Sequence, residues 1–223
     1  MEADGREPER RSTLDPLLVQ RLVPFFVSCA LYFFLWVPSQ EPSWTSALAK
    51  CLPIHFLALF VHSNAPSGTY GRFIWLGLLC SILGDIFVTW PDHFLVGMVA
   101  SALAHLFYIK ALGWLPTRQA FLKSVMVIFL LYFGPLQPHL PSQLSLPVVV
   151  YAAVLCLMLW RALVRGRSAA LSGLFFSISH GLKAWTTFFW PLPASQMIIM
   201  FTYYTAQAVL ALSAVERRAP QDD

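Results

Sequence analysis

Residues 71–90 read GRFIWLGLLCSILGDIFVTW, a run of twenty residues in which Arg72 and Asp85 are the charged side chains. A helix needs about 20 mostly apolar residues to cross the roughly 30 Å hydrocarbon core of a bilayer. The run therefore predicts a membrane-spanning helix that carries a carboxyl group well inside the membrane. Because an ionised carboxylate at that depth costs about 3 kcal/mol, neighbouring groups must compensate it.

Apolar runs of the same kind, bounded by proline, glycine or charged residues, fill most of the chain on both sides of this segment. They cover residues 22–37, 46–62, 94–112, 120–137, 146–163, 169–190 and 194–214. Of the 223 residues, 57% are hydrophobic and 12% charged, and the charged share is about half that of a soluble domain. We predict an all-α, polytopic membrane bundle of eight transmembrane helices over residues 22–214, between a polar N-terminal segment, 1–21, and a short tail, 215–223.

Basic residues predict the orientation of this bundle. Thirteen of the fifteen lysines and arginines fall on the side of the membrane where the chain begins: Arg6, Arg10, Arg11, Arg21, Arg72, Lys110, Arg118, Lys123, Arg161, Arg165, Arg167, Arg217 and Arg218. Cytoplasmic loops of membrane proteins are enriched in these residues. With an even number of spans, the pattern predicts that both termini are cytoplasmic. Thinly spread basic residues do not indicate a nucleic-acid partner.

Several classes of site lack their motif in this sequence. The four cysteines lie inside apolar runs without C-x-x-C spacing, so neither a disulfide framework nor a zinc knuckle is indicated. H-E-x-x-H and H-x-x-x-H are absent, and so is the G-x-S-x-G of serine hydrolases. We expect no metal and no cofactor.

Polar side chains inside the predicted spans are the candidates for function, because such residues usually face a cavity. Asp85 shares a helix face with Ser81 and Gly84, and the small glycine allows a neighbouring helix or a ligand to come close. His180, which stands on one helix face with Lys183, is a candidate proton donor. A histidine hydrogen-bonded in the bundle core is the alternative interpretation of His180.

Eight polar residues in the spans form a candidate substrate-binding set: Lys50, Ser81, His105, Tyr108, Lys183, Tyr203, Tyr204 and Gln207. At about 1.5 Å of helix rise per residue, Lys50, His105, Lys183, Tyr203 and Gln207 lie near the midplane or in the half of the membrane away from the termini, as Asp85 and His180 do, so one polar cavity could collect these side chains. Lys50 could instead extend its ammonium to the headgroups, and the tyrosines and Gln207 could simply bond helix to helix. Either Lys50 or Lys183 could bind a lipid phosphate.

Several of these residues also carry a family resemblance. Lys50-Cys-Leu-Pro53, Ser81-x-x-Gly84-Asp85, His105-x-x-Tyr108, Leu174-Phe-Phe-x-x-Ser179, Tyr203-Tyr-x-Ala-Gln207 and Leu212-Ser-Ala-Val-Glu216 occur in that order. Over residues 22–217 the chain resembles the lysoplasmalogenases of the YhhN-like membrane family, in their vertebrate branch. The resemblance implies eight membrane helices in the endoplasmic reticulum membrane. It also implies hydrolysis of the vinyl ether bond of lysoplasmenylcholine or lysoplasmenylethanolamine to a fatty aldehyde and a glycerophospho head group.

One position departs from that pattern. Relatives carry Ser-Asp where this chain has Ser179-His180, so the paired carboxylates of the family map onto Asp85 and position 180. We expect Asp85 and His180 to be the catalytic residues, with a lysophospholipid as substrate and the bilayer as surroundings. Two alternatives are a lipid-binding relative with impaired catalysis, and a proton-coupled lipid or solute transporter that uses Asp85 and His180 as a relay.

Overall fold

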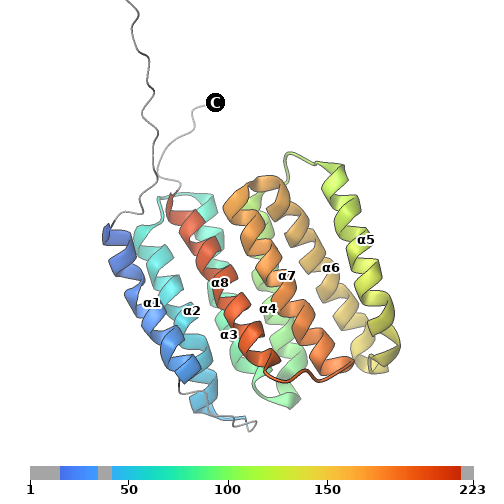
Figure 1. The fold of residues 1–223 in the computed structure, drawn as a ribbon. Coiled ribbons are helices and arrows are strands. Elements are labelled where there is room, and N and C mark those ends of the chain that lie inside the picture. Colours follow the sequence, from blue (N-terminus) through green and yellow to red (C-terminus); the bar gives the residue numbers. More distant parts are fainter. Residues whose placement is uncertain (1–15, 35–41, 217–223) are drawn as a thin grey trace, which may run out of the picture.

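The computed structural model describes residues 16–34 and 42–216, and this part of the chain folds into eight α-helices and two short 3-10 helices without any strand (Figure 1). The predicted all-α class and the number of helices are thereby confirmed. Residues 35–37 of the first predicted span lie outside the described residues. So do five of the basic residues used for orientation, Arg6, Arg10, Arg11, Arg217 and Arg218.

The helix bounds follow the predicted spans with shifts at most ends. The α-helices are α1 Pro16–Phe34, α2 Trp44–Asn64, α3 Thr69–Val88, α4 Phe94–Leu112, α5 Gln119–Leu136, α6 Ser142–Arg165, α7 Arg167–Phe188 and α8 Ser195–Glu216, with η1 Pro91–His93 before α4 and η2 Gln137–His139 after α5. α6 begins at Ser142, ahead of the predicted span 146–163, and continues through Pro147. Proline is tolerated in membrane helices because neighbouring groups satisfy the freed carbonyl.

Local sequence explains several helix ends. Ser43 caps α2, because its side chain accepts from the Ser46 backbone while the Ser46 side chain accepts from the Ser43 backbone. A single residue, Gly166, separates α6 from α7. Its φ of +142° is a conformation that residues with a Cβ rarely adopt, so glycine permits this abrupt reversal between two long helices.

Seven of the helices in the described part are long and apolar enough to cross a membrane. α7 is the exception, because Ser177, Ser179, His180 and Lys183 lower its hydropathy. Large apolar side chains are exposed on the outer helices, among them Ile128 and Leu131 of α5. Such side chains suit contact with lipid tails, so the fold is that of a multi-pass membrane protein.

Consecutive helices run in opposite directions, and the start of α1 and the end of α8 lie at the same end of the bundle (Figure 1). α3 and α4 pack closely where Gly84 meets Gly97, since a Cβ on Gly84 would lie 2.4 Å from the Ser101 hydroxyl. The expected close approach at Gly84 is therefore made by a neighbouring helix.

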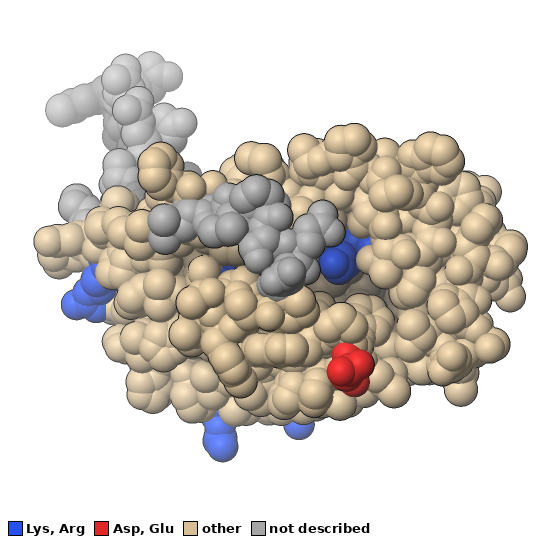
Figure 2. Space-filling view, turned by 90° about the horizontal axis from the view of Figure 1, so that it is seen from below, with Lys and Arg blue, Asp and Glu red and all other residues tan. Residues whose placement is uncertain are grey.

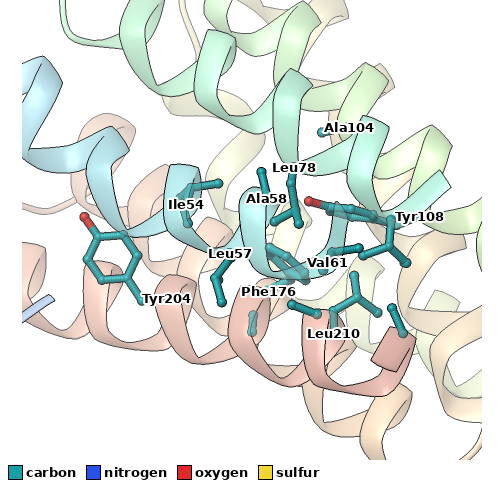
Figure 3. Close-up of a cluster of buried hydrophobic side chains, with 14 of the residues drawn as sticks. Ile54, Leu57, Ala58, Val61, Leu78, Ala104, Tyr108, Phe176, Tyr204 and Leu210 are labelled. Atoms are coloured by element: carbon teal, nitrogen blue, oxygen red, sulfur yellow. The ribbon is translucent and has the colours of Figure 1, made fainter. Parts of the chain in front are cut away.

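The main apolar core contains buried side chains from every described α-helix except α5, most of them from α2, α4 and α8 (Figure 3). Ile54 and Leu57 of α2, Leu78 of α3, Phe176 of α7 and Leu210 of α8 are almost completely buried there. α5 packs mainly against α6 at the edge of the bundle. A smaller apolar cluster under α5 joins it to α6, and the space between α5 and the other helices is where the site lies.

A buried arginine holds the connection from α4 to α5. Arg161 of α6 is fully buried and donates hydrogen bonds to the backbone carbonyls of Gly113, Leu115 and Pro116, at 2.6, 3.2 and 2.8 Å. A guanidinium with its fixed fork of donors suits three carbonyls at once. Arg161, counted above as an orientation signal, therefore also fixes the loop that places α5.

Candidate active site

A cavity of about 770 Å³ lies among α4, α5, α6, α7 and α8, and Lys50 of α2 and Asp85 of α3 also line it. The volume is within the range of small-molecule sites, roughly 300–1,000 Å³. Most of the lining side chains are apolar, including Phe129, Leu155 and Leu182. Viewed from the end where α7 joins α8, Figure 2 shows a hollow that contains a Lys or Arg side chain. The basic side chains of the cavity wall are Lys50 and Lys183.

Asp85 lies in the cavity wall and is 8% exposed. Its Oδ1 forms an ion pair with the ammonium of Lys50 at 2.9 Å, and its Oδ2 accepts a hydrogen bond from the hydroxyl of Tyr203 at 2.8 Å. An opposite charge and a hydrogen-bond donor at these distances stabilise a carboxylate where lipid or protein replaces water. These two contacts supply the compensation that the sequence required for Asp85.

Lys50 turns into the bundle rather than toward the headgroups. Its ammonium lies on Asp85, and its backbone carbonyl accepts a hydrogen bond from the Tyr204 hydroxyl at 2.9 Å. The ring of Tyr204 packs edge-on against Tyr32 of α1. Tyr204 therefore anchors α8 to α2 and lies behind the cavity wall.

His180 of α7 also lines the cavity. The Tyr151 hydroxyl of α6 lies 3.0 Å from Nδ1 and 3.4 Å from Nε2 of His180. Aromatic rings surround the imidazole, with Phe176 stacked at 6.1 Å and Tyr203 edge-on at the same centroid distance. Tyr203 thus contacts both candidate catalytic side chains, through its hydroxyl at Asp85 and through its ring at His180.

His105 lies behind His180, with 5.1 Å between the ring centroids. Its Nδ1 lies 2.7 Å from the Ser101 carbonyl, which identifies Nδ1 as the protonated nitrogen. Nε2 is buried without a hydrogen-bond partner among the described residues. His105 is absent from the cavity wall, and it contacts the site through the rings of His180 and Tyr151.

Three more of the predicted substrate-binding residues form a closed hydrogen-bonded triangle outside the cavity wall. Tyr108 donates to Oε1 of Gln207 at 2.7 Å, and Gln207 donates to the Ser81 hydroxyl at 3.0 Å. The hydroxyls of Ser81 and Tyr108 complete the triangle at 3.2 Å. All three side chains are buried, and they join α3, α4 and α8 behind Asp85.

The polar face of α7 divides into two parts. Ser179 donates to the Ile199 carbonyl of α8 at 2.8 Å, and Ser172 donates to the Ala206 carbonyl at 2.9 Å. These hydroxyls bond helix to helix. Lys183 and Thr187, further along the same helix, line the cavity.

Sequence reasoning missed two tyrosines of the site, Tyr151 on α6 and Tyr132 on α5. Tyr132 donates to the Gly181 carbonyl at 2.6 Å and so connects the outlying α5 to α7 across the cavity. Tyrosine usually lies at the membrane interface. The position of Tyr151 in the middle of an apolar span is therefore unusual, and it could have marked Tyr151 as a candidate site residue. No group of three or more His, Cys, Asp or Glu side chains that could hold a metal ion occurs in residues 16–34 and 42–216.

Comparisons with known proteins give the family. The model of the YhhN family matches residues 45–214, well over half of the chain. The chain belongs to the YhhN family. Every cavity-lining residue described above falls inside the matched range, so the site is part of the YhhN domain, and the resemblance stated from the sequence is confirmed.

Curated relatives of this YhhN protein cover most of its length. Lysoplasmalogenase TMEM86B of Rattus norvegicus is 43% identical over 90% of this chain and 86% of its own. The protein of that name from Homo sapiens is 41% identical over 93% of this chain and 92% of its own. Lysoplasmalogenase TMEM86A of Bos taurus is 37% identical over 91% of this chain and 92% of its own. No solved structure matches this YhhN protein.

Proposed function

We propose that this YhhN protein is a lysoplasmalogenase, an ether hydrolase that cleaves the vinyl ether bond of lysoplasmenylcholine or lysoplasmenylethanolamine. The observation that carries the proposal is the Lys50–Asp85 ion pair in the wall of a mostly apolar cavity inside a membrane bundle. Relatives of the same family at about 40% identity bear the name lysoplasmalogenase. The cavity offers a charged reaction centre beside room for an alkyl chain.

The reaction begins with a proton. Protonation of the outer alkene carbon of the vinyl ether converts the ether carbon into an oxocarbenium ion. Water adds to that carbon, and the resulting hemiacetal collapses to a fatty aldehyde and the free hydroxyl of glycerophosphocholine or glycerophosphoethanolamine. A catalyst must therefore donate a proton, stabilise a cation and activate a water molecule.

Asp85 is suited to the second and third tasks. A fixed carboxylate stabilises an oxocarbenium ion, as in glycosidases, and it can accept a proton from the attacking water. Lys50 and Tyr203 hold the two oxygens of the carboxylate in place. Because these contacts exist before substrate binds, the carboxylate needs no reorganisation during the reaction.

His180 is the proton donor of the proposal, in the place where relatives carry a second carboxylate. A protonated imidazole can donate to the alkene carbon and later accept a proton from water. The hydrogen bond between Tyr151 and His180 fixes the orientation of the ring. Tyr203, which contacts both His180 and Asp85, sets the spacing of the two groups.

The membrane arrangement of the proposal has eight spans. α7 runs alongside the other helices (Figure 1), and its polar residues line the cavity or bond to α8, so we infer that it crosses the bilayer as well. The excess of basic residues at the end where α1 begins favours cytoplasmic termini. We propose the endoplasmic reticulum membrane as the location, with a lysophospholipid as the partner and no cofactor.

Aldehyde release from a defined lysoplasmalogen by the purified full chain tests the function. Wild-type protein should release aldehyde, and Asp85→Asn should abolish release, since an amide can neither stabilise the cation nor accept a proton. Asp92→Asn, the same substitution at an exposed position in η1 outside the cavity, should leave the rate unchanged. A non-catalytic lipid-binding protein would bind the lipid without aldehyde, and a transporter would move it across liposomes without aldehyde.

A further inference from the structure

We propose that Lys183 binds the phosphate of the lysophospholipid and thereby sets the direction in which the substrate lies in the cavity. The inference rests on the proposed function, whose reaction centre is Asp85 and His180. The headgroup then lies toward the connection between α7 and α8, and the alkenyl chain lies toward the connection between α6 and α7.

The two lysines of the cavity wall differ in whether their ammonium groups have a partner. The ammonium of Lys50 is already engaged, 2.9 Å from Asp85 and next to the reaction centre. Lys183 also lines the cavity, and among the described residues its ammonium forms no hydrogen bond or ion pair. A cation in a mostly apolar wall loses hydration that only a polar ligand or water can replace. Of the two lysines, Lys183 is therefore the one available to a ligand.

The charge of the cavity wall also favours an anionic ligand. The two lysines, Lys50 and Lys183, face a single carboxylate, Asp85, in the described wall, and the protonated His180 of the proposed reaction adds to this positive excess. The phosphodiester of a lysophospholipid carries one negative charge. Binding it beside Lys183 reduces the positive excess, and the Thr187 hydroxyl one turn further along α7, which also lines the cavity, adds a second donor for a phosphate oxygen.

The spacing of Lys183 and His180 along α7 fits the glycerol backbone of the substrate. In a lysoplasmalogen, the ether oxygen and the phosphorus are separated by five covalent bonds through the glycerol carbons. Lys183 follows His180 by three residues on the same face of α7, which is about 4.5 Å of helix rise. A phosphate beside Lys183 therefore leaves the vinyl ether at the level of His180 without stretching the glycerol.

The opposite end of the cavity suits the alkenyl chain. On the other side of His180 the wall is mostly apolar, with Val125 of α5, Leu159 of α6 and Leu174 of α7, and the Ser177 hydroxyl there donates to the Gly173 carbonyl of its own helix. Leu174 precedes His180 by six residues, about 9 Å of helix rise. A headgroup placed there would lose its hydration without gaining a charged partner, whereas an alkyl chain gains apolar contact. The substrate therefore binds with its chain toward Leu174.

Ligand binding without turnover tests the role of Lys183. The probes are 1-O-alkyl-lysophosphatidylcholine, which lacks the vinyl bond, and 1-O-alkylglycerol, which lacks the phosphate as well. Trp185 lines the cavity, so tryptophan fluorescence of the purified full chain reports occupancy, and thermal stabilisation by ligand provides a second measurement. Lys183→Met should weaken binding of the phospholipid by about 10-fold or more, as expected for a lost charged hydrogen bond, and leave binding of the alkylglycerol unchanged.

Matched variants make the result specific. Lys183→Arg keeps the charge and should retain most of the affinity, while Lys123→Met removes an exposed lysine of α5 outside the cavity wall and should change nothing. Equal loss of both ligands in Lys183→Met, or no loss of either, would overturn the proposal. So would wild-type binding of inorganic phosphate as tight as that of the phospholipid, because the site would then serve free phosphate. The binding measurements do not require the protein to release aldehyde. Failure of the Lys183 proposal can therefore be distinguished from failure of the hydrolase proposal.

Discussion

The ammonium of Lys50 on α2 and the carboxylate of Asp85 on α3 lie 2.9 Å apart in the wall of a mostly apolar cavity. The two side chains are 18% and 12% exposed, so water screens their attraction only in part. Each charge would be costly at this depth without the other. The ion pair therefore determines both the stability of the helix pair and the state of the candidate reaction centre.

Removing Lys50 should destabilise the protein through Asp85. Lys50→Met leaves an uncompensated carboxylate, a defect that costs about 3–5 kcal/mol in buried ion pairs, so the thermal unfolding midpoint of the purified protein should fall. The double variant Lys50→Met, Asp85→Asn should recover most of the midpoint and remain without aldehyde release. An unchanged midpoint in the single variant would mean that the ion pair does not stabilise the fold.

Tyr203 should matter for both the rate and the fold. Tyr203→Phe keeps the ring against His180 and removes the hydroxyl that donates to Asp85. A hydrogen bond to a charged group contributes about 1.5–3 kcal/mol to stability, so the unfolding midpoint should fall. Because one oxygen of the Asp85 carboxylate is then no longer held in place, kcat for aldehyde release by the folded protein should fall roughly 10- to 100-fold. Tyr204→Phe, which loses a bond to the Lys50 backbone outside the cavity, should retain most of the rate. Wild-type kcat in Tyr203→Phe would exclude the assigned role.

His180 can be tested by two substitutions with opposite expectations. His180→Phe removes both ring nitrogens and should abolish aldehyde release, because no proton donor remains beside the vinyl ether. His180→Asp supplies the second carboxylate that the family resemblance implies at this position, and two nearby carboxylates can share a proton, so activity should persist. Activity in His180→Phe would place the proton donor elsewhere. Activity that appears only in His180→Asp would identify the parent as a lipid-binding relative.

The triangle of Ser81, Tyr108 and Gln207 should act on stability. Tyr108→Phe leaves Oε1 of the buried Gln207 without its 2.7 Å donor, and an unsatisfied buried polar group costs about 1–3 kcal/mol. We expect a lower unfolding midpoint and a KM for lysoplasmalogen close to that of the wild type, since the triangle lies outside the cavity wall. A raised KM with an unchanged midpoint would instead restore the expectation that these residues bind substrate.

Gly77 should tolerate no side chain. A Cβ at this position would lie 2.1 Å from the ring of Tyr108, and overpacking of this kind typically costs about 1–3 kcal/mol. Gly77→Ala should therefore lower the unfolding midpoint. Gly134→Ala on α5 is the matched control, because a Cβ at Gly134 would meet no atom within 4 Å; it should leave the midpoint unchanged or raise it slightly, as alanine favours helix. Equal midpoints in the two variants would contradict the packing argument.

Helix placement and the candidate polar residues were accessible from the sequence because both depend on local properties. A run of apolar residues long enough to cross the bilayer must form a helix, since lipid offers no partner for its backbone. A carboxyl group in such a run, as at Asp85, is conspicuous by its energetic cost alone. The ends of the helices were harder to predict from the sequence. α6 continues through Pro147 and α1 begins at Pro16, and hydropathy does not predict where either helix begins.

Pairing within the site was decided by the tertiary structure. From the sequence, the Lys50 ammonium could lie either at the lipid headgroups or in the polar site. Packing of α2 against α3 places it on Asp85. Nothing in the sequence predicted the hydrogen bond between Tyr151 and His180. Nor did it predict that Tyr203 lines the cavity while its neighbour Tyr204 lies behind the cavity wall. These outcomes depend on the rotation of each helix about its axis and on contacts between segments far apart in the chain. The hydropathy of one segment predicts neither the rotation of its helix nor these long-range contacts, because both depend on how side chains of different helices fit together.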